Sequence, residues 1–415
     1  MEKYVINGGR KINGKLKVQS AKNAVLPMMA GAILTKEEVV IKDCPKILDV
    51  MNMIKILEAL GVSVTFAEND LIVNAKGLNS CSVSGELCKE LRSSVFLMGA
   101  LVARLKKAKI SLPGGCDIGA RPIDLHVKAL NSLSVKTIIN DNDIECVTDK
   151  VKGGKIRLDF PSVGATENAM LCAVLAEGKT EIHNPAREPE IVDLMKFLNS
   201  MGAKVFGAGT SIILIEGVEK LRGTTYKPMG DRIEAGTYML ASVITGGELE
   251  ISGINHKNIC SLIHKLCDNT CKISIKNDII YLKSGAVKKP FNIVTSPHPG
   301  YPTDLQAQTM SLLAVSDGDS MVHESVFEKR FNHVEELKKL GADILVRGRD
   351  AIIRGVKRLH GEKVTAKDLR GGAGLVVAAL NAEGVTEING VYHIERGYLD
   401  MPKKLTELNA DIKVF

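Results

Sequence analysis

The sequence predicts an α/β protein of two domains, each built from three copies of a unit of about 70 residues around a pseudo-threefold axis. The main observation is a short motif, in which the end of an amphipathic helix is followed by a small or polar residue and then a strand. Its second residue stands at positions 61, 134, 202, 270, 341 and 409, so successive copies are 68 to 73 residues apart. Six regularly spaced copies in 415 residues predict two domains of three units, with a boundary near residues 227–230.

A second sequence element recurs at the same spacing as this motif. It is a helix rich in Ala, Gly and Met that ends in a turn and a short strand, as in Thr166–Ile182, Glu234–Ile251 and Gly371–Ile388. Small and apolar side chains occupy most of its circumference, which is typical of a helix buried on nearly all sides. We therefore expect these helices at the centre of each domain and the sheets outside them.

The other helix of each unit is amphipathic, as residues 190–201 illustrate. Apolar side chains recur at helical spacing along one face: Ile191, Leu194, Met195, Leu198 and Met201. The polar side chains between them are expected to face water: Glu190, Asp193, Lys196 and Asn199.

Composition excludes several classes of protein. The net charge of +7 comes from interleaved basic and acidic residues, and aromatic residues make up only 4%, which argues against a nucleic-acid partner. The longest apolar stretch, Ala24–Leu34, contains a proline and a glycine and is too short to cross a membrane. The N-terminus does not resemble a signal peptide, and the nine cysteines contain no CxxC pair. These features predict a cytoplasmic protein with reduced thiols and no zinc site.

Arginines precede the amphipathic helix in four of the six units, at Arg121, Arg187, Arg330 and Arg396. An arginine beside the free N–H groups of a helix start is suited to bind a carboxylate or a phosphate. The alternative is that these arginines pair with nearby acids such as Glu188, Glu328 and Glu395, and the pattern leaves both possibilities open.

Three further positions are candidates for chemistry. Cys116 stands in a glycine-rich loop five residues before Arg121, whose charge would lower the pKa of the thiol. Lys22 opens the first buried helix, where a lysine is costly unless it points into a wet cleft. Asp304 follows Pro-Thr, where a helix N-cap and a general base are both plausible roles.

Nine motifs carry a resemblance to a known family over the whole chain. They are SAKNAVLP (20–27), LRSSVFLMGALVAR (91–104), PGGCDIGARPIDLH (113–126), SVGATEN (162–168), REPEIVD (187–193), GDRIEAGTY (230–238), YPTDLQAQ (301–308), EKRFNHVEEL (328–337) and ERGY (395–398). In this order they resemble the UDP-N-acetylglucosamine 1-carboxyvinyltransferase family. One departure is Phe160-Pro161, where some members carry a lysine before the Ser-Val-Gly segment.

The resemblance implies two inside-out α/β barrels, residues 18–229 and residues 1–17 with 230–415, with the active site in the cleft between them. It implies that the 3′-hydroxyl of UDP-N-acetylglucosamine adds to C2 of phosphoenolpyruvate while C3 is protonated. Loss of phosphate then leaves an enol ether, which is the first committed step of peptidoglycan synthesis. No cofactor, metal, nucleic acid or membrane partner is implied.

The resemblance also implies residue roles. Cys116 matches the general acid, which fosfomycin would alkylate, and Asp304 matches the group that accepts the hydroxyl proton. The residues matching phosphoenolpyruvate contacts are Lys22, Asn23, Arg121, Arg330, Arg370 and Arg396, with Lys22 and Arg396 also counted as catalytic. Those matching UDP-N-acetylglucosamine contacts are Asn23, Arg92, Arg121, Pro122, Ile123, Asp124, Leu125, Ser162, Val163, Gly164, Asp304 and Val326.

Two other functions are alternatives to this one. The shikimate-pathway enolpyruvyl transferase shares the fold and phosphoenolpyruvate, but it lacks the PGGC loop and the REPEIVD segment. A non-catalytic regulatory paralogue would also share the fold, but it would be free to lose Lys22, Cys116, Arg121, Asp304 and Arg396, all of which are present.

Overall fold

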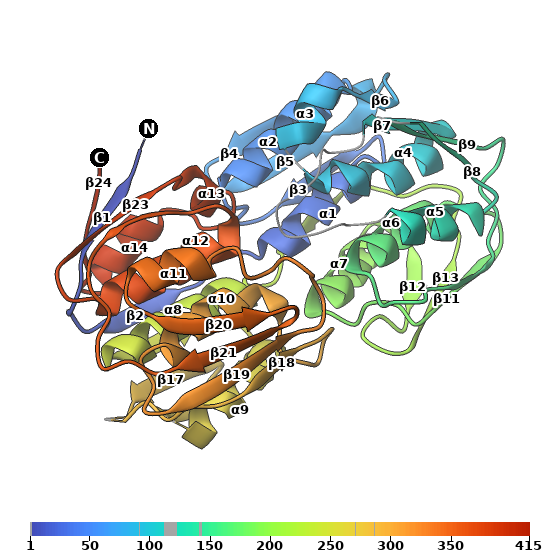
Figure 1. Ribbon diagram of the computed structural model, residues 1–415. Coiled ribbons are helices and arrows are strands. Elements are labelled where there is room, and N and C mark those ends of the chain that lie inside the picture. Colours follow the sequence, from blue (N-terminus) through green and yellow to red (C-terminus); the bar gives the residue numbers. More distant parts are fainter. Residues whose placement is uncertain (1, 91, 112–122, 141–142, 270, 286) are drawn as a thin grey trace. The chain divides into compact units, whose positions relative to one another are not determined.

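The computed structural model describes residues 2–90, 92–111, 123–140, 143–269, 271–285 and 287–415. The chain divides into two compact units (Figure 1). Unit 1 contains the residues up to Gln19 and those from Gly230 to Phe415, and unit 2 contains the described residues from Ser20 to Met229. The chain therefore passes between the units at residues 19–20 and again at 229–230.

Within the described residues, each unit contains three four-stranded sheets. In unit 2 the strand orders are β14-β3-β5-β4, β6-β7-β9-β8 and β10-β11-β13-β12. The strands of unit 2 are β3 (Glu38–Ile41), β4 (Ser63–Ala67), β5 (Asp70–Asn74), β6 (Ser82–Val83), β7 (Lys107–Ser111), β8 (Lys136–Ile139), β9 (Asp143–Val147), β10 (Lys155–Arg157), β11 (Lys179–His183), β12 (Lys204–Phe206), β13 (Ile212–Glu216) and β14 (Thr224–Tyr226).

In unit 1 the strand orders are β2-β15-β17-β16, β18-β19-β21-β20 and β22-β23-β1-β24. The strands are β1 (Tyr4–Asn7), β2 (Gly14–Lys17), β15 (Glu248–Ser252), β16 (Cys271–Lys276), β17 (Ile279–Ser284), β18 (Ile293–Thr295), β19 (Asp319–Glu324), β20 (Asp343–Arg347), β21 (Asp350–Arg354), β22 (Lys363–Thr365), β23 (Val385–Asn389) and β24 (Asp411–Val414). The N-terminal strands β1 and β2 thus complete two sheets of unit 1.

All six sheets follow one pattern. The first two strands of each order run parallel, and the remaining neighbours run antiparallel. A parallel pair needs a crossover connection. In four sheets this connection contains a buried helix, whereas the chain between β3 and β14, and between β2 and β15, runs through most or all of unit 2. In these two sheets a buried helix directly precedes β3 or β15. The predicted α/β class with six related units is confirmed.

The buried helices pack against one another inside each unit. Those of unit 2 are α1 (Lys22–Ala32), α4 (Leu97–Leu105) and α6 (Val163–Ala173), and those of unit 1 are α8 (Arg232–Thr245), α10 (Gln306–Leu313) and α12 (Leu369–Asn381). Gly99 permits the close approach of α4 to α6, since a Cβ there would lie 2.3 Å from the Asn168 carbonyl oxygen. The helices therefore form the core and the sheets lie outside.

The sixfold motif corresponds to the ends of the amphipathic helices. Its second residue has positive φ in the described copies, at Gly61 (87°), Ser134 (63°), Gly202 (97°), Gly341 (95°) and Asn409 (78°). A left-handed residue of this kind stops a helix and turns the chain into the next strand, which explains why glycine and asparagine recur there. The amphipathic helices are α2 (Leu48–Ala59), α5 (Asp124–Asn131), α7 (Pro189–Ser200), α9 (Cys260–Asn269), α11 (Val334–Lys339) and α14 (Met401–Glu407).

One expectation for α7 is wrong. Glu190 and Asp193 are only 2% and 7% exposed and do not face water. The carboxylate of Asp193 accepts hydrogen bonds from the Tyr226 hydroxyl (2.7 Å) and from the Met229 amide (2.8 Å). It is buried because it holds the end of unit 2, next to the point where the chain enters unit 1.

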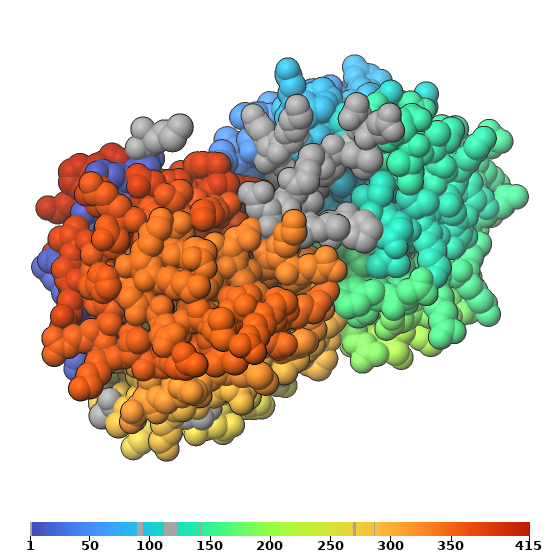
Figure 2. Space-filling model, viewed as in Figure 1, coloured from blue at the N-terminus to red at the C-terminus, as the bar shows by residue number. Residues whose placement is uncertain are grey.

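The outer faces of the sheets are exposed. In Figure 2 the orange sheet β18-β19-β21-β20 forms part of the surface, and Met321, Leu345 and Ile352 on it are at least 37% exposed. Within the described part of the chain, no helix is both long enough and apolar enough to cross a membrane.

Candidate active site

Asp304 lies at the centre of a charged cluster in unit 1. It stands in the short helix η4 (Thr303–Leu305), directly before α10. Arg330 Nη2 donates to its Oδ1 over 2.8 Å, and Arg370 Nη2 donates to its Oδ2 over 2.9 Å. The N-cap positions of η4 and α10 belong to Pro302 and Leu305, so Asp304 is not the helix cap.

The two arginines of this cluster are buried, whereas Asp304 is partly exposed to solvent. The side chains of Arg330 and Arg370 are 4% and 6% exposed, whereas that of Asp304 is 26% exposed. Two guanidinium groups stabilise the ionised carboxylate, which is the form a general base requires. The three groups carry one excess positive charge, so the cluster favours a further anion.

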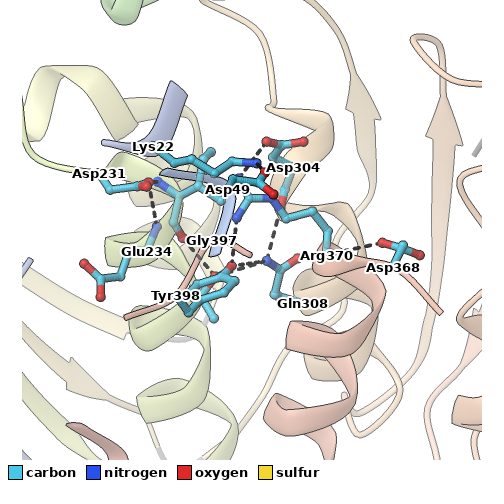
Figure 3. A network of polar contacts seen from close by, with 12 residues as sticks. Lys22, Asp49, Asp231, Glu234, Asp304, Gln308, Asp368, Arg370, Gly397 and Tyr398 are labelled. Carbon is cyan, nitrogen blue, oxygen red and sulfur yellow. Dashed lines mark hydrogen bonds and ion pairs between the residues drawn. The ribbon is translucent and has the colours of Figure 1, made fainter. Parts of the chain in front are cut away.

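Arg370 is held from behind by a neutral polar network (Figure 3). Its Nη1 donates to the Tyr398 hydroxyl over 3.2 Å, and that hydroxyl also contacts Thr237 Oγ1 (2.8 Å) and Gln308 Nε2 (3.2 Å). Burial lowers the pKa of Arg370, but the charge of Asp304, together with smaller contributions from Tyr398 and Asp231, more than offsets it, so the net pKa lies above its usual range. The guanidinium is therefore a permanent cation in a fixed position.

Val326 is tied to the same segment through Glu324. The Glu324 carboxylate accepts hydrogen bonds from the backbone amides of Val326 (2.9 Å) and Phe327 (3.0 Å). It also accepts one from the hydroxyl of Thr303 (2.9 Å), the neighbour of Asp304. Glu324 is fully buried, so it fixes the relation between the two loops.

The other arginines of unit 1 differ in their surroundings. Arg330 forms an ion pair with Asp304, and Glu328 lies 3.4 Å from Arg349. Arg330 therefore does not pair with its sequence neighbour Glu328. Arg396 is the half-buried C-cap of α13 (Tyr392–Glu395).

In unit 2, Lys22 is the first residue of α1 and is paired with Asp49 of α2. Lys22 Nζ lies 2.9 Å from Asp49 Oδ2, and the two side chains are 12% and 1% exposed. A cation at a helix N-terminus is unfavourable, so the buried carboxylate compensates for both the helix dipole and the loss of water. Asn23 follows Lys22 on the same first turn and is half-buried.

Two helix starts meet elsewhere in unit 2. Ser162 is the N-cap of α6, with Val163 and Gly164 in the first turn, and its hydroxyl accepts from the Ala165 amide over 3.3 Å. Ile123 is the N-cap of α5, where Asp124 and Leu125 begin the helix.

His126 of α5 connects the two helices. Its Nδ1 lies 3.0 Å from Asn168 Nδ2 of α6, and Asn168 Oδ1 accepts from the Gly99 amide of α4 over 2.8 Å. Burial lowers the pKa of His126 to about 4, so it is neutral at physiological pH and accepts at Nδ1. The start of α6 carries free backbone N–H groups, which suit a phosphate.

Some predicted site residues fall outside this description. Cys116, Arg121 and Pro122 lie outside the described residues, and of Arg92 only the backbone is described, in η2 (Arg92–Phe96). Among the described residues no group of three or more His, Cys, Asp or Glu side chains is arranged to hold a metal ion.

Several supporting residues were not singled out from the sequence. They are Asp49, His126, Asn168, Glu324, Gln308 and Tyr398. Four of them stand inside the motifs quoted above. For Asn168 of α6 and Gln308 of α10 the available signal was a polar side chain within an otherwise apolar, buried helix. Asp49 and Glu324 had no such signal, because a single acid beside an apolar run is indistinguishable from a surface residue.

Comparison with known proteins gives a consistent result. Residues 6–405 match the family described as EPSP synthase (3-phosphoshikimate 1-carboxyvinyltransferase). The chain is 50% identical over 415 residues to UDP-N-acetylglucosamine 1-carboxyvinyltransferase 2 of Caldanaerobacter subterraneus subsp. tengcongensis, covering 99% of both chains. It is 44% identical to the UDP-N-acetylglucosamine 1-carboxyvinyltransferase of Trichlorobacter lovleyi, covering 100% of this chain and 99% of the relative.

Solved structures agree on the fold. The enolpyruvyl transferase NikO of Streptomyces tendae has a TM-score of 0.89 at 24% identity, covering 100% of this chain and 99% of that one. An EPSP synthase of Acinetobacter baumannii has a TM-score of 0.77 at 16% identity, with 100% of both chains covered. At these identities the likeness establishes the architecture alone.

Proposed function

Since the chain belongs to the EPSP synthase family of carboxyvinyltransferases, we propose that it transfers the enolpyruvyl group of phosphoenolpyruvate to the 3′-hydroxyl of UDP-N-acetylglucosamine. Phosphate is released, and the product is the first committed precursor of peptidoglycan. The observation that carries the choice of acceptor is the identity of 44% to 50% over the whole chain to relatives named for this substrate. EPSP synthase structures share only 16% to 17%.

Asp304 is the proposed base for the addition step. The acceptor O3′ forms a bond to C2 of phosphoenolpyruvate, its proton passes to the Asp304 carboxylate, and C3 takes a proton from Cys116. The partial exposure of Asp304 in front of two buried arginines supports this role, because the carboxylate is ionised and accessible. Elimination of phosphate with loss of a proton from C3 restores the double bond.

The cations bind the anionic donor. We assign the phosphate and carboxylate of phosphoenolpyruvate to Lys22, Asn23, Arg121, Arg330, Arg370 and Arg396. The excess positive charge around Asp304 supports the assignment for Arg330 and Arg370, which Asp304 neutralises only in part. Preorganised cations of this kind stabilise the charge that develops as the phosphate leaves, which is usually a large share of catalysis.

The acceptor contacts are assigned largely to unit 2. The N-terminus of α6 at Ser162–Gly164 offers backbone donors for the diphosphate, and the neighbouring start of α5 at Ile123–Leu125 offers apolar and polar surface for the uridine. Arg92, Arg121, Pro122, Asn23, Asp304 and Val326 complete the proposed set.

The test is release of phosphate from phosphoenolpyruvate with and without UDP-N-acetylglucosamine. Release is expected to require both substrates and to be lost in Cys116→Ala, while Cys260→Ala serves as the control for a half-buried thiol in unit 1. Release with shikimate 3-phosphate instead would move the protein to the sister activity. Folded protein that releases no phosphate with either acceptor would contradict the proposal and favour a non-catalytic role.

A further inference from the structure

Gln19 occupies a special position in the chain, because it is the last residue of unit 1 before the chain enters unit 2. Both the amide and the carbonyl of the Gln19 backbone form hydrogen bonds. The Gln19 amide donates to Glu234 Oε2 over 2.6 Å, and its carbonyl accepts from the Asp231 amide over 2.8 Å. Glu234 and Asp231 belong to the start of α8, so Gln19 is anchored to a core helix of unit 1.

The anchor itself is a buried carboxyl group. The second oxygen of Glu234 accepts from Lys404 Nζ of α14 over 2.6 Å, and the two side chains are 1% and 18% exposed. A buried carboxyl group with both oxygens engaged has little freedom to move, because breaking either contact leaves a buried polar atom without its partner. Gln19 is thus attached to a rigid point.

The side chain of Gln19 uses both ends of its amide on one turn. Its Nε2 donates to the Gly397 carbonyl over 3.0 Å, and its Oε1 accepts from the Leu399 amide over 3.0 Å. A primary amide supplies its donor and its acceptor from two separate atoms, so one side chain can bind two backbone groups of the turn. The turn begins directly after Arg396, which is the C-cap of α13.

The same turn is fixed from its other side. Between the two residues that Gln19 holds stands Tyr398, whose hydroxyl contacts Arg370 and Gln308 (Figure 3). The same hydroxyl also contacts Thr237. The backbone that follows Arg396 is therefore held by Gln19, and its central side chain is held by the network behind Arg370. Since one peptide bond separates Arg396 from Gly397, a shift of the turn moves the guanidinium of Arg396.

We infer that Gln19 is a positioning residue for Arg396, and through Arg396 for phosphoenolpyruvate. The inference rests on the proposed function, in which Arg396 contacts that substrate. Gln19 itself touches no substrate in this role. Its effect is to keep the Arg396 backbone in register with Arg370, so that both cations meet one anion.

The test is a double-mutant cycle on the full-length protein. Gln19→Met keeps the length of the side chain and removes both hydrogen bonds, and Arg396→Ala removes the cation that the turn positions. Gln19→Met is expected to lower kcat/KM for phosphoenolpyruvate by about tenfold to a hundredfold, the scale of a misplacement near 1 Å. KM for UDP-N-acetylglucosamine is expected to stay within about twofold of the wild-type value.

The cycle separates positioning from general destabilisation. In the Arg396→Ala background, Gln19→Met is expected to add less than about a twofold loss, because its effect passes through the missing arginine. Equal losses in both backgrounds, equal changes in the KM of both substrates, or no loss at all would each overturn the inference. Asn13→Ala is the matched control, since Asn13 Oδ1 ties another loop of unit 1 to the Glu248 amide over 2.7 Å, and it should change neither KM.

A replacement variant and a wild-type control ensure that every outcome can be interpreted. If Gln19→Met does not fold, as judged by far-UV circular dichroism, Gln19→Glu takes its place, because it keeps the acceptor for Leu399 and loses the donor to Gly397. Wild-type protein is assayed first with both substrates. A wild type without phosphate release would refute the proposed function and this inference with it, whereas an active wild type with an additive cycle would refute this inference alone.

Discussion

Three buried tyrosines of unit 1 provide a direct test of the polar network behind Arg370. Tyr4, Tyr238 and Tyr398 are each at most 2% exposed, so replacement by phenylalanine changes hydrogen bonding and little else. The Tyr398 hydroxyl makes three contacts, one of them with Arg370. The Tyr4 hydroxyl has one long contact, to Glu395 at 3.4 Å. Among the described residues, the Tyr238 hydroxyl has no hydrogen-bond partner.

The magnitudes follow from those contacts. A neutral hydrogen bond contributes about 0.5–1.5 kcal/mol and one to a charged group about 1.5–3 kcal/mol, so loss of two neutral contacts and one charged contact in Tyr398→Phe should lower the free energy of unfolding by about 2.5–6 kcal/mol. Tyr4→Phe should change it by less than about 1 kcal/mol. Tyr238→Phe removes a buried hydroxyl without a partner and should raise stability by about 1–2 kcal/mol.

The assay is urea unfolding of the full chain, followed by far-UV circular dichroism and compared at the unfolding midpoint with the m value held constant. The expected order of stability is Tyr238→Phe above wild type, with Tyr4→Phe near it and Tyr398→Phe lowest. If Tyr238→Phe is as destabilising as Tyr398→Phe, hydrogen bonding does not decide the effect and the reasoning fails.

Three further predictions concern other sites. Asp304→Asn should lower kcat by about 10²–10⁴-fold through loss of the base, and a phosphate-release rate near wild type would contradict its role. Burial raises the pKa of Glu234 to about 7, although Lys404 lowers it, so the folded state holds a proton between about pH 4.3 and 7 that the unfolded chain releases. Stability should therefore fall as pH rises through that window, by about 4 kcal/mol in all and by about 3 kcal/mol above pH 5. Urea midpoints at pH 5 and 8 should show a smaller difference in Glu234→Gln. Ser134→Gly should raise stability by about 1 kcal/mol, because Ser134 has a φ of 63°, and a lowered melting temperature would refute this.

Local chemistry made much of the fold predictable. Each unit has to stop an amphipathic helix and turn into a strand, and residues such as Gly61 and Asn409 record that left-handed turn directly in the sequence. The buried helices were equally predictable from the sequence, because a helix surrounded by other helices leaves room only for small and apolar side chains. Both signals act within one unit and repeat six times.

The partners of the charged residues were not predictable in this way. Glu190 and Asp193 occupy polar positions of an amphipathic helix, yet both are buried, and Asp193 binds a tyrosine 33 residues further along the chain. Lys22 was expected to need water, but Asp49 of the next helix supplies its counter-charge. Such contacts depend on how two elements pack, which no local pattern records.

The sequence by itself determined that the chain has six related units, which helices are buried, and that Lys22, Asp304 and the arginines are the groups to examine. Only the tertiary structure decided that Asp304 lies between Arg330 and Arg370 and that Gln19 holds the turn after Arg396. The physical reason is the distance along the chain over which each kind of interaction acts. Helix stops and apolar faces are set by neighbours within a few residues, whereas a buried charge takes the nearest opposite charge in space, and Asp304 and Arg370 are 66 residues apart.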